Sequence, residues 1–338
     1  MSATAAPYAA MVLDARSGEV LHSENANTRL HPASLTKMMT LYITFEAVQH
    51  GEITMDTMVT VSRNAASEPP SKLGLREGQK IKLRYLVRAA AVKSANDAAT
   101  AIGEAISGTE MAFAARMTRT AKALGMNATT FKNANGLTQS GHLSTAHDMS
   151  LLGRHMVYDY PQYYNLFSRV STDAGMREVY NTNRRFLRSY KGADGIKTGY
   201  TRAAGFNLVA SAERGRERII TTVFGGRSTS TRNAKVAELM DLGFKRAKTN
   251  VALRKPSMPA YLGNRGLSVM VAKSADPSPE GARGKTVRVV AAAVTRSLRP
   301  QARPGTGEVD VAPLVAEIEG DIETVLAQVQ TAEETAVA

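Results

Sequence analysis

Three short polar motifs follow one another along the chain, and each carries groups that acyl transfer through a serine ester requires. They are Ser34-Leu-Thr-Lys37, Ser94-Ala-Asn96 and Lys197-Thr-Gly199. A serine hydroxyl is a weak nucleophile at neutral pH, so it needs a neighbouring base. A lysine three residues later on a helix lies on the same face, one turn away. The first motif therefore indicates Ser34 as a nucleophile and Lys37 as its base.

Lys37 can act as a base only if its pKa falls far below the usual value of about 10.4. Burial or a nearby positive charge would lower that pKa, and Lys197 is the candidate for the charge. The run from Ser34 to His50 contains no Pro or Gly and is followed by Gly51, which predicts one helix with Ser34 at its start. A helix N-terminus favours the negative charge that develops in a tetrahedral intermediate.

The Lys197 motif lies in a strand-like setting, because Ile196, Thr198 and Tyr200 alternate with Lys197 and Gly199. This pattern predicts an edge strand on which a glycine lets a substrate backbone approach closely. Lys197 and Thr198 would offer a cation and a hydroxyl to a carboxylate. In isolation the motif is equally typical of a solvated edge strand that a lysine protects from pairing.

Ser94 and Asn96 lie in a polar interruption between two stretches with helix-like apolar spacing. The pattern predicts a helix-loop-helix that presents both side chains to a cleft. Neither this motif nor Ser-x-x-Lys is informative alone, since a chain of this length contains roughly one Ser-x-x-Lys by chance. The order of the three motifs and their context are what indicate an enzyme.

Longer segments around the motifs carry a resemblance to a known family. They are PASLTKMMT around Ser34, DGIKTGYTRAAGFNLVASA around Lys197 and FGGRSTSTRNAKVAELMDLGF around Arg227. With the three motifs, the chain resembles the low-molecular-mass penicillin-binding proteins, the serine-type D-alanyl-D-alanine carboxypeptidases, over about residues 7 to 247. The resemblance implies an α/β (α+β) fold of the β-lactamase/transpeptidase type, with an antiparallel sheet, a helical lobe and a cleft between them.

The resemblance also implies a role for each motif residue. Ser34 corresponds to the acylated nucleophile, Lys37 to its proton acceptor, and Ser94 to the serine that relays a proton to the leaving group. The expected substrate-binding residues are Asn96 for the amide, Gly199 for backbone approach, and Lys197, Thr198 and Arg227 for the terminal carboxylate. The backbone N–H groups of Ser34 and Tyr200 would form the oxyanion hole. Ala95 departs from the glycine usual in the family.

The function implied by the resemblance is removal of the terminal D-alanine from peptidoglycan stem peptides through an acyl-Ser34 intermediate, which β-lactams should also form. A D,D-endopeptidase acting on cross-linked peptidoglycan would share that intermediate and stays open. An alternative from another class is an inactive cell-wall-binding scaffold. A class A β-lactamase is less favoured, because Glu178-Val-Tyr-Asn181 is one residue short of the Glu-x-x-x-Asn element.

The flanking sequence predicts the helices and strands that carry these residues. The stretch YAAMVLDARSGEVLHSEN predicts a hairpin. Strands are predicted over 206–212 and 218–224, and helices over 111–124, over 145–158 with a Thr145-x-x-Asp148 capping box, and over 229–242 with a glycine stop at Gly243. These elements place a catalytic domain over 1–247.

Beyond residue 247 the resemblance ends. Residues 248–310 are rich in Pro, Gly and Arg and contain two short β-like patches, which predicts a linker. Residues 311–332 show a four-three apolar spacing that predicts an amphipathic helix with an acidic polar face. Such a face suits anionic lipids poorly. Packing or self-association is therefore expected of it, with a solvated tail helix as an equal alternative.

Composition narrows the remaining classes of function. The 338 residues carry a formal net charge of +13 and contain no Cys and no Trp. The absence of Cys excludes thiol catalysis and thiolate zinc sites. Dispersed basic residues without aromatic clusters argue against nucleic-acid binding. A cationic body would instead be attracted to anionic cell-wall polymers and membrane surfaces.

No cofactor or metal is expected, because no His-Glu-x-x-His motif occurs and His142, His147 and His155 suit surface or capping roles. The first residues lack a signal peptide in this numbering, and no apolar run is long enough for a transmembrane helix. The expected substrate nevertheless implies a periplasmic or other extracytoplasmic location.

Overall fold

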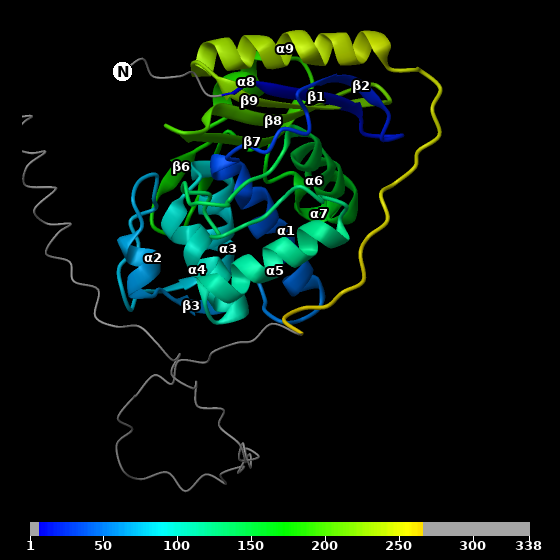
Figure 1. The fold of residues 1–338 in the computed structure, drawn as a ribbon. Helices are drawn as coiled ribbons and strands as arrows, with labels where there is room; N and C mark the ends of the chain where they lie inside the picture. The colour runs from blue at the N-terminus through cyan, green and yellow to red at the C-terminus, as the bar shows by residue number, and fades with distance from the viewer. Residues whose placement is uncertain (1–6, 266–338) are drawn as a thin grey trace, which may run out of the picture. The chain divides into compact units, whose positions relative to one another are not determined.

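The computed structural model describes residues 7–265, and a five-stranded antiparallel sheet is its central layer. The strand order is β2-β1-β9-β8-β7. The N-terminal strand β1 therefore pairs with β9, the last strand of the sheet in chain order. Figure 1 shows α9 across one face of the sheet and the helical lobe on the other. The strands are β1 (Ala9–Asp14), β2 (Val20–Glu24), β7 (Ala193–Thr201), β8 (Gly205–Arg214) and β9 (Glu217–Gly226).

Alternation along β1 divides its side chains between two hydrophobic cores. Ala10 and Val12 pack in the core beneath α9, whereas Met11 and Leu13 pack in the core of the helical lobe. Successive side chains of a strand point to opposite faces, so a strand covered on both sides reads as a nearly continuous apolar run. This explains the sequence AAMVLD and the complete burial of β1.

The helical lobe is built around one buried helix. Nearly every residue of α1 (Thr36–Gln49) is buried, as expected for a helix that is surrounded by other elements. Around it lie the short helices η1 (Ala33–Leu35) and η2 (Ala89–Lys93), and α2 (Arg63–Ser67), α3 (Leu83–Arg88), α4 (Asn96–Ser107), α5 (Glu110–Ala123), α6 (Ala146–Asp159) and α7 (Pro161–Tyr164). The short helix α8 (Arg184–Ser189) instead contacts β7, and its Phe186 packs in the core beneath α9. Two small hairpins, β3–β4 (Met58–Thr60, Lys80–Lys82) and β5–β6 (Ser171–Asp173, Glu178–Tyr180), complete the lobe.

Most of the predicted elements are confirmed, and one helix is longer than expected. The hairpin, the three later strands and the helices over 111–124 and 145–158 lie within two residues or so of their predicted positions. However, α9 runs from Thr229 to Arg246, so Gly243 lies inside the helix rather than after it. A Cβ on Gly243 would lie 2.8 Å from side-chain atoms of Val12 and Ile219. The glycine therefore permits close packing of α9 on the sheet.

The predicted capping box at the start of α6 is only half formed. The Thr145 hydroxyl accepts a hydrogen bond from the Asp148 N–H at 3.0 Å, as the motif predicts. The Asp148 carboxylate instead accepts from the Thr129 hydroxyl at 2.7 Å and the Ala128 N–H at 3.0 Å. A preceding loop thus takes the place of the helix N-terminus as the partner of Asp148.

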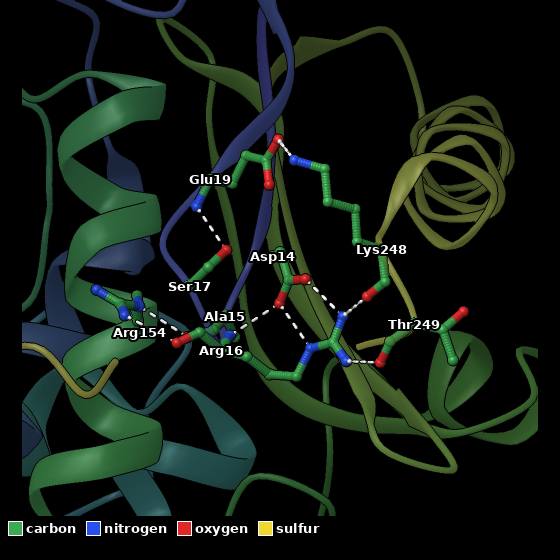
Figure 2. A network of polar contacts seen from close by, with 8 residues as sticks. All are labelled: Asp14, Ala15, Arg16, Ser17, Glu19, Arg154, Lys248 and Thr249. Atoms are coloured by element: carbon green, nitrogen blue, oxygen red, sulfur yellow. Dashed lines mark hydrogen bonds and ion pairs between the residues drawn. The ribbon is translucent and has the colours of Figure 1, made fainter. Parts of the chain in front are cut away.

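After α9, residues 248–265 run as an extended segment, here called the strap, against the body of the domain. At one end the buried Arg16 guanidinium pairs with Asp14 at 2.7 Å and donates to the carbonyls of Lys248 at 2.7 Å and Thr249 at 3.2 Å (Figure 2). At the other end the Asn264 amide accepts from the Ser107 hydroxyl at 2.8 Å and donates to the Ile106 carbonyl at 2.8 Å. Side-chain contacts therefore hold both ends of the strap.

The amphipathic helix predicted over 311–332 and most of the linker predicted over 248–310 lie outside the described residues. Within residues 7–265 no helix has both the length and the apolar character needed to cross a bilayer.

Candidate active site

The three motifs converge on one cleft of about 340 Å³ between the helical lobe and the edge strand β7. Its walls include Ser34, Ser94, Asn96, Thr198, Gly199 and Tyr200. A larger hollow of about 890 Å³ lies between the strap and the β8–β9 turn, but none of the motif residues lines it. The chemistry predicted from the sequence is therefore confined to the smaller cleft.

Ser34 lies in the helical turn η1, which runs directly into α1. The helix predicted from Ser34 to His50 is thus present, with a tighter first turn than an α-helix. The preceding residue, Ala33, has a φ of +50°, a left-handed conformation that is uncommon for residues other than glycine. Strained backbone of this kind is often found where a side chain must be held at a functional site.

The amine of Lys37 contacts three oxygen atoms. Lys37 Nζ lies 3.0 Å from Ser34 Oγ, 2.8 Å from Asn96 Oδ1 and 2.7 Å from the carbonyl oxygen of Asn135. The Asn96 amide is oriented by donation from its Nδ2 to the Pro69 carbonyl at 2.8 Å. A neutral amine has two N–H donors and one lone pair. The amide oxygen and the carbonyl can only accept, so the lone pair remains for the Ser34 O–H.

The pKa of Lys37 is lowered well below its usual value, chiefly because the side chain is completely buried. The positive charge of Lys197 lowers it further, whereas the carboxylates of Glu68 and Asp97 oppose the shift. Desolvation disfavours the protonated amine, and a neighbouring cation repels the added proton. The environment thus favours the neutral form that a general base requires.

Ser94 lies at the junction between η2 and α4, as the predicted helix-loop-helix requires. The turn η2 is a π-helix, and Ser94 at its end has a φ of +64°. The Ser94 hydroxyl accepts a hydrogen bond from Lys197 Nζ at 2.9 Å. Because the lysine supplies that donor, the O–H of Ser94 remains available to donate to another group.

Lys197, Thr198 and Gly199 lie on the edge strand β7, as predicted. Burial, and then the nearby charge of Arg232, lower the pKa of Lys197 to about 7. A Cβ on Gly199 would lie 2.8 Å from the carbonyl oxygen of Pro32 and 3.2 Å from the backbone nitrogen of Ser34. Gly199 therefore allows β7 to pack against the Ser34 turn, in addition to any approach by a substrate. The next residue on β7, Tyr200, is a largely exposed part of the cleft wall.

Arg227 does not lie where the sequence predicts. Its side chain is exposed and does not line the cleft, whereas the buried Arg232 does line it. Arg227 precedes the N-cap Ser228, while Arg232 lies in the first turns of α9 beside Gly226, where an added Cβ would be 2.9 Å from Arg232 Cβ. A cation near a helix N-terminus opposes the helix dipole. An arginine at this unfavourable position of the predicted helix could therefore have indicated a functional role for Arg232.

Other residues that contribute to the site lie outside the motifs, and three of them contact the motif residues or complete the cleft wall. Asn135 supplies the carbonyl that contacts Lys37, and Gly136 lines the cleft. The Thr182 hydroxyl lies 2.7 Å from that of Thr198. The sequence signal for the first two was the turn-like run Asn133-Ala-Asn-Gly136. No local pattern marks Thr182, which follows the short strand β6.

Two of the histidines are buried rather than on the surface. The His142 ring accepts from the Lys132 N–H through Nδ1 at 3.2 Å, so Nε2 carries the proton and donates to the Thr36 hydroxyl at 2.9 Å. His155 Nδ1 pairs with the Asp159 carboxylate at 2.8 Å, whereas the side chain of His147 is partly exposed. Burial lowers the pKa of His142 to about 4. Among the residues described, no group of three or more His, Asp or Glu side chains is arranged to hold a metal ion.

Comparisons with known proteins agree on one family. A family model described as D-alanyl-D-alanine carboxypeptidase, peptidase S11, matches residues 2–228. The D-alanyl-D-alanine carboxypeptidase DacF of Bacillus subtilis is 38% identical over 246 residues, which are 71% of this chain and 63% of that protein. This chain therefore spans less than two thirds of that relative's length.

Two solved structures have similar folds. The structure of the D-alanyl-D-alanine carboxypeptidase DacD from Francisella tularensis is 34% identical, with a TM-score of 0.66 over 69% of both chains. The cefotaxime-bound penicillin-binding protein D2 of Listeria monocytogenes is 33% identical, with a TM-score of 0.64 over 70% of this chain and 96% of that one.

Proposed function

The chain belongs to the D-alanyl-D-alanine carboxypeptidase family, peptidase S11, and from that membership we propose that it removes the terminal D-alanine of peptidoglycan stem peptides. The observation that carries the proposal is the contact set of Lys37. Two of its neighbours can only accept hydrogen bonds, which directs the amine lone pair toward the Ser34 hydroxyl at 3.0 Å. This is the arrangement that a serine nucleophile with a lysine base requires.

In the acylation step Ser34 Oγ attacks the carbonyl carbon between the two terminal D-alanines, and the hydroxyl proton passes to Lys37 Nζ. The negative charge then forms on the former carbonyl oxygen. The proposed donors to this oxyanion are the backbone N–H groups of Ser34 and Tyr200, both of which line the cleft. Each such donor stabilises a transition state by roughly 3 kcal/mol in other acyl-transfer enzymes.

Collapse of the tetrahedral intermediate breaks the C–N bond, and the departing nitrogen must gain a proton. We assign that donation to the Ser94 O–H, since Lys197 Nζ donates to the Ser94 oxygen at 2.9 Å and leaves the O–H free. The Ser94 oxygen regains a proton from Lys197 Nζ along their 2.9 Å hydrogen bond, and Lys197 regains one from solvent, while Lys37 releases to solvent the proton that it took from Ser34. Water then attacks the acyl-Ser34 ester, the neutral Lys37 accepts a proton from that water, and this proton passes to Ser34 Oγ as the ester C–O bond breaks. The products are the shortened stem peptide and free D-alanine.

The terminal carboxylate of the substrate is assigned to the side of the cleft formed by β7 and the start of α9. Thr198 and Arg232 line the cleft there, and Lys197 lies behind them. A guanidinium pairs strongly with a carboxylate in a partly desolvated site. This assignment replaces Arg227 with Arg232. Asn96, with its Oδ1 on Lys37, remains the proposed contact for the substrate amide.

β-Lactams are proposed to acylate Ser34, because their strained amide resembles the scissile bond. The substrate also leads us to propose an extracytoplasmic location and an association with peptidoglycan that the formal charge of +13 strengthens. A D,D-endopeptidase activity on cross-linked peptidoglycan would use the same acyl-enzyme and is the second candidate.

The test is intact-protein mass spectrometry after brief exposure to benzylpenicillin, with Ser34→Ala as the matched control. We expect one penicilloyl adduct on the native chain and none on the variant. An unlabelled native chain would favour the inactive wall-binding scaffold instead. Incubation with a stem pentapeptide and with a cross-linked dimer then separates the two activities: release of free D-alanine indicates the carboxypeptidase, and conversion of dimer to monomer the endopeptidase.

A further inference from the structure

Glu68 is a buried carboxylate behind the catalytic amine, in none of the three motifs. It directly follows α2 and is 9% exposed. One of its oxygens, Oε1, accepts from the Thr100 hydroxyl at 2.8 Å and from the Asn135 side-chain amide at 2.8 Å. Both donors are neutral. In the described part of the chain, Glu68 takes part in no ion pair.

The Asn135 side chain is fixed at both ends. Its Nδ2 donates to Glu68 at 2.8 Å and to Thr100 Oγ1 at 3.0 Å, and its Oδ1 accepts from the Leu137 N–H at 2.9 Å. The Asn135 carbonyl accepts from Lys37 Nζ at 2.7 Å. Glu68 thus fixes the residue whose carbonyl takes one proton of the amine and so helps direct the lone pair.

The charged groups around Lys37 come from several elements. Lys197 faces it from β7, Asp97 from α4 and Glu68 from the loop after α2, while Glu110 of α5 faces Glu68. The Asp97 carboxylate accepts from four backbone N–H groups, those of Leu73, Gly74, Leu75 and Ala98. Its charge is stabilised locally by those four donors. Among residues 7–265 Glu68 has two donors, both neutral, so its charge is less compensated than that of Asp97.

We propose that Glu68 is a positioning residue for Lys37, which holds the Asn135 carbonyl in place and whose negative charge sets the proton affinity of the amine. The proposal rests on the function proposed above. The proposal contains two effects that can be tested separately. The first is the hydrogen bond from Asn135 to Glu68, which depends on the length of the Glu68 side chain. The second is the negative charge of Glu68, which depends on its ionisation. A negative charge favours protonated Lys37 and so opposes the effect of burial on the amine.

The experiment measures the second-order rate constant for acylation by benzylpenicillin as a function of pH. Glu68→Gln keeps the shape and the accepting oxygen but removes the charge. Because Lys37 then loses a proton more readily, the acid limb of the profile should move to lower pH by about half a unit or more. The plateau rate should stay within about threefold of the native value, since the hydrogen bonds to Asn135 and Thr100 remain possible.

Glu68→Asp is the complementary variant, because it keeps the charge and shortens the reach. We expect a native acid limb and a plateau lowered by about tenfold, as the Asn135 carbonyl is no longer held in place. Glu104→Gln is the matched control. Its carboxylate lies in the same lobe and bonds to Ser62 and Asn64, neither of which contacts Lys37. This control should leave both limb and plateau unchanged.

The proposal would be overturned if the acid limb of the Glu68→Gln profile lay at the same pH as that of the native chain. It would also be overturned if the acid limb of the Glu104→Gln control moved by as much as that of Glu68→Gln. If the Glu68→Gln variant did not fold, as judged by thermal unfolding, the Glu68→Asp variant would decide: a native plateau would overturn the proposal. Failure of the native chain to react with penicillin would instead count against the proposed function, so the two ideas fail by different results.

Discussion

A Cβ atom on Gly136 would lie 1.9 Å from the carbonyl oxygen of Ala33. Gly136 has a φ of +86°, and it packs against the strained turn that carries Ser34, the proposed nucleophile. The position of Ser34 therefore depends on a glycine that follows it by about a hundred residues in sequence. Neither Gly136 nor Ala33 contributes a side-chain functional group to the chemistry.

This contact predicts that Gly136→Ala displaces the Ser34 turn. The methyl group would clash with a backbone oxygen, which cannot rotate away, so we expect a loss of about 3 kcal/mol or more of stability together with loss of penicillin acylation. Gly51→Ala is the control, because Gly51 also has a positive φ, +73°, but faces open space. It should cost about 1 kcal/mol and leave acylation intact. Thermal unfolding and the acylation rate report both effects.

The charge of Lys197 predicts the opposite pH shift to that of Glu68→Gln. Lys197 has a pKa of about 7, so below that pH its charge opposes protonation of Lys37. In Lys197→Met the pKa of Lys37 should rise, and the acid limb of acylation should move to higher pH by about half a unit to one unit.

The plateau of the Lys197→Met profile should also fall, because Ser94 loses its hydrogen bond from the amine. The profile is measured with penicillin from about pH 5 to about pH 9. Lys191→Met, a change at an exposed lysine just before the same strand, is the control and should reproduce the native profile. An unshifted limb in Lys197→Met would show that the two amines do not interact.

Substitution of the two arginines that follow β9 should affect kcat/KM very differently. Arg232 is 4% exposed and lines the cleft, whereas Arg227 is exposed and does not line it. We expect Arg232→Ala to lower kcat/KM for a peptide with a free C-terminal carboxylate by about a hundredfold, the effect of losing a charge-assisted hydrogen bond of roughly 3 kcal/mol.

Arg227→Ala should retain nearly native kcat/KM in the same assay. A second substrate, with its terminal carboxylate converted to an amide, should react poorly with the native chain and lose little more in Arg232→Ala. Equal losses in the two arginine variants would contradict the assignment of the carboxylate to Arg232.

Loss of the contacts that hold the strap should lower the stability of the domain without directly affecting catalysis. In Arg16→Ala the Asp14 carboxylate, 1% exposed, loses its only ion-pair partner among the described residues, and the strap loses two hydrogen bonds. Breaking a buried ion pair on one side costs about 3 kcal/mol or more. Lys248→Ala is the control, since its side chain is 71% exposed and its ion pair with Glu19 is on the surface.

Chemical denaturation and limited proteolysis within residues 248–265 measure the strap's contribution. We expect Arg16→Ala to be less stable and to be cut faster in the strap, and Lys248→Ala to behave like the native chain. Below its unfolding transition Arg16→Ala should still react with penicillin, because the strap does not line the cleft. If Arg16→Ala unfolded at the same denaturant concentration as the native chain, the contacts between Arg16 and the strap would make no measurable contribution to stability.

The sequence alone was sufficient for the class of fold and for the residues whose geometry is local. Ser34 and Lys37 are three residues apart, and the spacing of a helical turn brings them together wherever that helix lies. The alternation around Lys197 identified a strand in the same way. The family relationship confirms the predicted transpeptidase-like fold, with an antiparallel sheet beside a helical lobe. The extent of α9 was misjudged because Gly243 serves packing, which local propensity does not register.

Tertiary structure decided which groups from distant parts of the chain complete the site. Asn135, 98 residues after Lys37, receives one proton of its amine, and Glu68 in turn holds Asn135. It also decided that Arg232 rather than Arg227 faces the cleft. The physical reason is the range of each effect. Helix and strand periods determine neighbours within a few residues, whereas the packing of α1 on α4 and of β7 on the Ser34 turn brings together the distant groups whose burial and charge control the pKa of Lys37.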